Sequence, residues 1–148
     1  MNGKRERSVT FYRQARVDGG VRTGLSIDGN TQWETFRPGK QIEDPSLLWY
    51  VDVRCRGANL PATPPEARRW LLRHAESIKS ALNDVPRKVQ FDDQLQPFEK
   101  HIQIDGGVDV GVFISAVRGA SSEVVAKQVR LVRQNWESLL EQLAPATN

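Results

Sequence analysis

The sequence is poor in the residues that build disulfides and metal sites. It contains one cysteine, Cys55, and two histidines, His74 and His101, among 148 residues. A single cysteine cannot form an intramolecular disulfide, and no pair of ligands has the spacing that structural zinc sites use. We therefore expect neither a bound metal nor a cofactor.

Long apolar runs are missing as well. No stretch approaches the roughly 20 consecutive apolar residues that a membrane-spanning helix needs. Residues 1–16 are basic but lack the apolar segment of a secretory signal. The sequence thus predicts a protein that does not enter the membrane and, by elimination, a cytoplasmic location.

The composition is typical of one globular domain. The chain is 39% hydrophobic and 26% charged, and its formal net charge is +3. A surplus of this size favours solubility, so the distribution of the charges matters more than their total. We predict a single α+β domain over residues 8–144, a disordered basic N-terminus over 1–7 and a frayed C-terminus over 145–148.

Alternation of apolar and polar residues predicts most of the strands. The first strand alternates over 9–17, interrupted by Arg13, and an Asp-Gly-Gly turn signal follows it at 18–20. The same signal recurs at 105–107. Further strands are expected at 21–27, 32–36, 47–56, 89–91, 98–104 and 108–116.

Apolar residues at three- and four-residue intervals predict two amphipathic helices. The first spans 63–82, and the second follows Ser121 or Ser122. Each carries a tryptophan, Trp70 or Trp136, on its apolar stripe, where we expect it to anchor the core.

These elements predict an α+β fold. The expected architecture is a mostly antiparallel sheet of about five to seven strands with both helices on one face, in the order βββ(β)α-βββα. Each half contains an Asp-Gly-Gly turn and an Arg-Gly pair before its helix (Arg56 and Gly57, Arg118 and Gly119). A degenerate internal repeat explains this pattern, and so does the common use of glycine in connections.

No group of residues carries a recognisable catalytic signature. Cys55 with His74 or His101 is the one conceivable thiol–imidazole pair, but Cys55 sits in an apolar strand, where a thiol is inert. The densest acidic cluster lacks the spacing of a calcium loop and is interpreted as solvated loop carboxylates. It consists of Asp92, Asp93, Glu99, His101 and Asp105.

One group of polar residues is a candidate binding surface. Tyr50, Arg54 and Arg56 share the polar side of one strand, and Tyr12 and Arg16 lie at polar-side positions of the first strand. If these strands are neighbours, one face of the sheet carries tyrosines and arginines together. Such a face can stack bases and bind phosphates, dock a protein, or simply be solvated.

Three functions remain open. We favour a non-catalytic protein-interaction module, such as an adaptor, a chaperone-like protein or a regulator, with a protein partner or self-association as a homodimer. The alternative is a nucleic-acid-binding accessory protein that uses the Arg/Tyr face. A second alternative is an enzyme or small-ligand binder whose polar residues converge only in the folded chain.

Overall fold

The computed structural model describes most of the chain, namely residues 6–15, 20–38, 48–85, 98–104, 106–117 and 122–145. Six strands form one sheet, and their bounds are β1 (Arg7–Ala15), β2 (Gly20–Ile27), β3 (Asn30–Pro38), β4 (Leu48–Gly57), β5 (Phe98–Ile104) and β6 (Val108–Val117). Four helices complete the described structure, and they are α1 (Pro64–Arg73), α2 (Ala75–Asn83), α3 (Ser122–Gln134) and α4 (Trp136–Glu141).

The sheet has the strand order β3-β2-β1-β4-β6-β5, and every neighbouring pair is antiparallel. In its middle, Val53 of β4 lies opposite Phe11 of β1 and Val112 of β6. All three side chains are fully buried. The alternation in the sequence therefore predicted the side that β1, β2, β4 and β6 bury.

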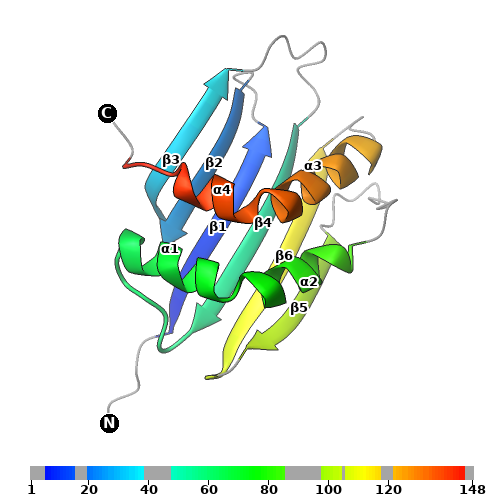
Figure 1. Cartoon of the computed structure of the whole chain (residues 1–148). Coiled ribbons are helices and arrows are strands. Elements are labelled where there is room, and N and C mark those ends of the chain that lie inside the picture. The colour runs from blue at the N-terminus through cyan, green and yellow to red at the C-terminus, as the bar shows by residue number, and fades with distance from the viewer. Residues whose placement is uncertain are drawn as a thin grey trace.

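All four helices cover the same face of the sheet (Figure 1). α1 packs beside α4, and α2 packs beside α3, so the two helical segments run antiparallel over the strands. The predicted α+β class, with helices on one face of an antiparallel sheet, is confirmed. None of the described helices has the length and apolar character needed to cross a membrane.

Each predicted helix is divided in two by a bend at one residue. His74 (φ −99°, ψ 21°) separates α1 from α2, and Asn135 (φ −113°, ψ 23°) separates α3 from α4. The i to i−4 hydrogen bonds continue through both bends, from His74 to Trp70 and from Asn135 to Leu131. The side-chain amide of Asn135 also donates to the Leu131 carbonyl at 3.0 Å. A side chain that hydrogen-bonds to the backbone within a helix is a known cause of bending.

Trp136 is the centre of the core. Its side chain is fully buried, its ring meets Phe11 edge-on at 4.7 Å between centroids, and its indole N–H donates to the Leu71 carbonyl at 3.2 Å. Trp70 differs from the prediction, because it is only partly buried and lies at the edge of the core, with its ring against His74. The two tryptophans are therefore not equivalent anchors.

Several sequence predictions fall on residues outside the described part of the chain. These are the strand at 89–91, the turn residues Asp18, Gly19 and Asp105, the pair Arg118 and Gly119, and the terminal residues 1–5 and 146–148. Gly106 and Gly107, which are described, join β5 to β6 with φ values of 89° and 77°. A left-handed turn of this kind favours glycine, as the turn signal predicted.

Trp136→Ala is expected to lower the free energy of unfolding by about 3–5 kcal/mol, because it empties the centre of the core and leaves the Leu71 carbonyl without its donor. Trp70→Ala is expected to cost clearly less. Denaturant unfolding of both variants measures the difference. A loss below about 1 kcal/mol for Trp136→Ala would show that the helices do not bury this side chain.

Candidate functional site

The face of the sheet that points away from the helices carries a set of polar and aromatic side chains, and no described element covers it. We call this side of the sheet the open face. Its principal side chains, given by the alternation and register of the strands, are Thr10, Tyr12, Arg22, Glu34, Phe36, Tyr50, Asp52, Arg54, Arg56, Glu99, His101, Asp109 and Phe113.

Four of the five predicted site residues share the open face. Tyr50, Arg54 and Arg56 alternate along β4, and Tyr12 of β1 lies beside them, opposite Asp52. Arg16 lies outside the described residues. The neighbouring strands thus place the tyrosines and arginines on one surface, as the alternation indicated.

Arg54 is the best-fixed cation of this surface. Its guanidinium carbon lies 4.1 Å from the ring centre of Phe113 and 6.0 Å from that of Tyr50. The same group donates to Asp52 Oδ2 at 3.0 and 3.3 Å. Stacking and ion pairing together hold the guanidinium flat against the sheet.

Asp52 is the buried member of this cluster. Its side chain is 15% exposed, and burial raises the pKa of the carboxyl, although Arg54 opposes the rise. Asp52 Oδ1 is buried and has no hydrogen-bond partner among the described residues. The carboxylate therefore depends on Arg54 for its charge balance, and the two residues act as a unit.

A second cluster lies on the other half of the open face. Arg22 is 4.7 Å from the ring centre of Phe36 and pairs with Glu34 at 2.9 Å. The hydroxyl of Tyr12 donates to the same Glu34 and lies 3.3 Å from the hydroxyl of Thr31. Tyr12 is only 6% exposed, so it supports this cluster, whereas Phe36 is 45% exposed and free for contact.

Glycines let the aromatic rings lie flat on the strands. A Cβ at Gly24 would come within 2.2 Å of the Tyr12 ring, and a Cβ at Gly111 would come within 2.6 Å of the Phe113 ring. The rings occupy the space of the missing side chains, an arrangement known to stabilise glycine in sheets. The Tyr12 and Phe113 rings are consequently packed against the backbone at Gly24 and Gly111.

His101 of β5 joins two carboxylates at one end of the open face. Nε2 lies 2.5 Å from Glu99 and Nδ1 lies 2.8 Å from Asp109, while the ring meets Phe113 edge-on at 5.4 Å. The hydrogen bonds to Glu99 and then to Asp109 raise the pKa of His101 above its usual value. Of the acidic cluster of the sequence, Glu99 and His101 belong to a strand and not to a loop, whereas Asp92, Asp93 and Asp105 lie outside the described residues.

Charges of opposite sign balance on the open face. Its arginines, Arg22 and Arg54, are each paired with a carboxylate, and Arg56 lies 3.6 Å from Glu6. Glu99 and Asp109 flank His101. Basic residues therefore do not dominate this surface, which the sequence alone did not reveal.

Cys55 lies on the opposite side of β4, in the core. It faces Val9 and Val110 in the register of the sheet and is fully buried. Burial, with a contribution from Asp109, raises the pKa of the thiol to about 12. His101 is on the open face and His74 is against Trp70, so the described chain brings neither imidazole to the thiol.

Phe36, Phe113 and His101 are members of the surface that the sequence analysis missed. Each has the opposite parity to the helix-facing residues of its strand, which is a signal available from alternation. Their significance needed the register, because only the order β4-β6-β5 places Phe113 and His101 beside Arg54. The described residues contain no group of side chains arranged to hold a metal ion.

No family model matches the chain, and no curated protein and no solved structure matches it. The function must therefore be inferred from the geometry.

Cys55 is expected to resist alkylation in the folded protein at neutral pH, because a buried thiol with a raised pKa supplies almost no thiolate. Incubation with iodoacetamide followed by mass spectrometry measures the modified fraction. Full labelling after unfolding in guanidinium chloride is the control. Rapid labelling of the native chain would contradict the burial of β4.

His101 is expected to titrate above the usual range of about 6.5, and Glu99→Gln and Asp109→Asn should each move its pKa back down. Because folding raises this pKa, the stabilisation is complete below the pKa of the unfolded chain and is lost as pH rises through the folded value. NMR titration measures the pKa. The stability advantage of the wild type over His101→Gln should be larger at pH 5 than at pH 8, and the reverse order would contradict the ion pairs.

Proposed function

We propose that this chain is a non-catalytic protein-interaction module of the cytoplasm that binds a protein partner on its open face. The observation that supports this most is Arg54, which is held between Phe113 and Tyr50 and is neutralised by Asp52. Arginine and aromatic residues are the types that contribute most to protein interfaces.

Rigidity supports the same proposal. Binding costs free energy for every side chain that must be ordered. On the open face this cost is already reduced, because Tyr12 and Phe113 lie against glycines and the arginines are stacked and paired. A surface of this kind is suited to a folded partner with its own rigid patch.

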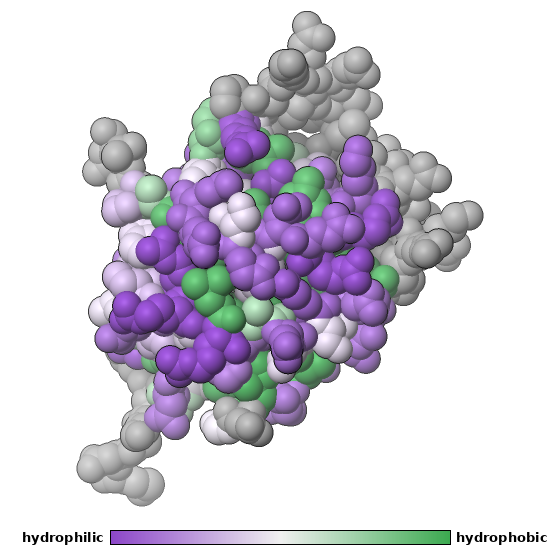
Figure 2. Space-filling view, viewed as in Figure 1, coloured by the Kyte–Doolittle hydropathy of each residue, from purple (hydrophilic) through white to green (hydrophobic). Residues whose placement is uncertain are grey.

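Exposed apolar area supports it as well. Among the described residues, Phe36 is the one exposed large apolar side chain, and it lies on the open face with Arg22 over its ring. On the helix side, by contrast, hydrophilic residues dominate the surface and the apolar areas are small and separated (Figure 2). The open face is therefore the more favourable side for docking.

Nucleic acid is the less favourable partner. Binding to a phosphate backbone is driven by unneutralised cations that displace counterions. Arg22 and Arg54 already pair with Glu34 and Asp52, and Glu99 and Asp109 add further negative charge. A phosphate chain laid on this face would meet carboxylates beside each arginine. A protein surface with both signs of charge fits better.

Arg54→Ala is the substitution that tests the proposed interface. A photo-crosslinking residue at position 50 identifies the partner in cells, and the same residue at position 69, on the helix side, is the control. With the purified partner, Arg54→Ala is expected to weaken binding about tenfold or more, as loss of an interface arginine does. Arg73→Ala, a matched change at an exposed position of α1, should leave the affinity unchanged.

Phe36→Ala is a second test of the interface that does not depend on the folding of Arg54→Ala. Phe36 is exposed, so its replacement should not unfold the chain. It too is expected to weaken binding. The proposal would be overturned if the partner crosslinked only from position 69. It would also be overturned if neither Arg54→Ala nor Phe36→Ala changed the affinity for the partner. Submicromolar binding of a random oligonucleotide at physiological salt, lost on Arg54→Ala, would assign the face to nucleic acid. A self-crosslinked dimer from position 50 would make a second copy the partner.

A further inference from the structure

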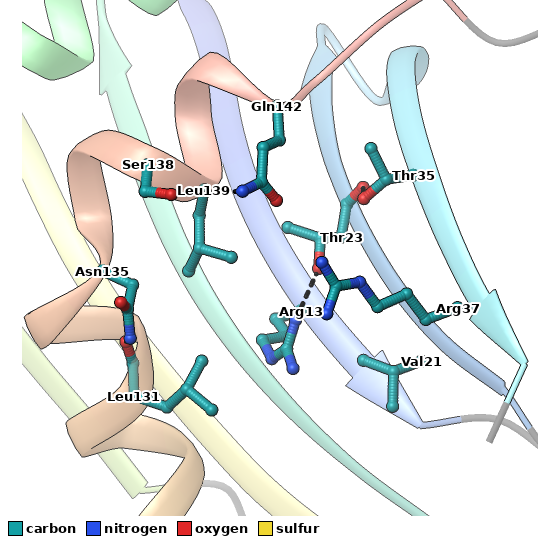
Figure 3. Close-up of a pocket in the computed structure, with 10 residues that line it drawn as sticks. All are labelled: Arg13, Val21, Thr23, Thr35, Arg37, Leu131, Asn135, Ser138, Leu139 and Gln142. Atoms are coloured by element: carbon teal, nitrogen blue, oxygen red, sulfur yellow. Dashed lines mark hydrogen bonds between the residues drawn. The ribbon is translucent and has the colours of Figure 1, made fainter. Parts of the chain in front are cut away.

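A cavity of about 230 Å³ lies on the other side of the sheet, between the strands β1 to β3 and the bent helix α3–α4 (Figure 3). It opens where the helix bends at Asn135, so α4 contributes one wall and the strands contribute the other. The described residues that line it are Arg13, Val21, Thr23, Thr35, Arg37, Leu131, Asn135, Ser138, Leu139 and Gln142.

Among the described residues, the lining contains two arginines and no carboxylate. Arg13 projects from the helix-facing side of β1, and Arg37 from the same side of β3. Figure 3 shows both side chains extending toward Thr23, whose hydroxyl accepts a hydrogen bond from Arg13. Two like charges thus share a small space.

Both arginines lack a charged partner among the described residues. Arg13 donates from Nε to the amide oxygen of Gln128 at 3.2 Å and from Nη1 to the hydroxyl of Thr23 at 2.9 Å, and both acceptors are neutral. Arg37 has no hydrogen bond or ion pair within the described chain. This contrasts with the open face, where each arginine has a carboxylate nearby.

An unneutralised pair of this kind is unfavourable. Burial, together with the charge of Arg37, lowers the pKa of Arg13. Arg13 is partly buried, and a partly buried cation is normally paired, because desolvation costs free energy that an opposite charge recovers. An anion between the two guanidinium groups would remove the repulsion and use the donors that Arg13 and Arg37 leave open.

We propose that this cavity binds the phosphate group of a small phosphomonoester. A doubly charged tetrahedral oxyanion matches two guanidinium forks in charge and in hydrogen-bond geometry. The hydroxyl of Ser138, which accepts a hydrogen bond from the side-chain amide of Gln142 at 3.2 Å, also lies in the wall. Val21, Leu131 and Leu139 form the apolar part of the lining and would contact a short apolar substituent on the ester.

The cavity limits the size of the ligand. Sites for drug-sized molecules usually enclose about 300–1,000 Å³, and this cavity is smaller. A phosphate with a few carbon atoms or one ring is therefore the class that fits. The site is separate from the open face, because the sheet lies between them, so either proposal can fail without the other.

Phenyl phosphate, inorganic phosphate and succinate are the probes for this site. Titration by calorimetry at constant ionic strength, with chloride as the background anion, measures their affinities for the whole chain. We expect phenyl phosphate to bind more tightly than inorganic phosphate, because of the apolar walls, and both to bind more tightly than succinate. Arg37→Gln is expected to weaken the binding of phenyl phosphate about tenfold, which is the usual effect of losing a hydrogen bond from a charged group.

Arg73→Gln, at an exposed position of α1 outside the cavity, is the matched control and should leave the affinity unchanged. Arg37 is exposed and has no described partner, so Arg37→Gln should fold. Thermal unfolding gives a second readout: phenyl phosphate should raise the midpoint of the wild type and raise that of Arg37→Gln much less. Absence of binding at about 10 mM phenyl phosphate, which is about tenfold above a Kd of about 1 mM, equal affinity for both variants, or tighter binding of succinate would each overturn the proposal.

Discussion

The two-residue period of β4 is the constraint on which the rest of the structure depends. This strand pairs with β1 and β6 and so lies inside the sheet, with Val51, Val53 and Cys55 in the core and the residues between them on the open face. A slip of one residue in register would exchange the two sets and place Arg54 beneath the helices. The burial of three apolar side chains therefore also determines where the candidate interface lies. Core and surface are two consequences of one register.

The bends in the helices follow from the need to cover a twisted sheet. A straight helix would leave part of the apolar face of the sheet uncovered, because neighbouring strands rotate relative to one another. After the bend at Asn135, the ring of Trp136 packs against Phe11. The antiparallel helical segment bends at His74, one turn after Leu71, whose carbonyl accepts the Trp136 indole N–H. The same change of direction opens the cavity beside Arg13. Core packing and the cavity therefore share a single structural cause.

Alternation alone predicted the described strands, the buried face and the position of four of the five site residues. It could not predict the bends, because the hydrogen-bond ladder and the apolar spacing continue through His74 and Asn135. It also could not pair charges across strands, so Arg54 and Arg22 resembled a basic surface until the register placed Asp52 and Glu34 beside them. Arg13, by contrast, was visible as an interruption of an apolar strand face, but its meaning required the lining of the cavity.

The distribution of charge separates the two sides of the molecule. The chain has a net charge of +3, yet the arginines of the open face are matched by carboxylates, whereas the helices and the strand face beneath them carry more basic than acidic residues. Long-range attraction of anions therefore favours the helix side, where Arg13 and Arg37 line the cavity, and short-range complementarity favours the open face. An arginine that is paired with a carboxylate of the same chain attracts a distant partner only weakly. A partner of the open face must therefore be recognised by its shape and by stacking once the two surfaces touch. The balanced face is consequently suited to specific docking, and the unbalanced cavity to capture of a small anion.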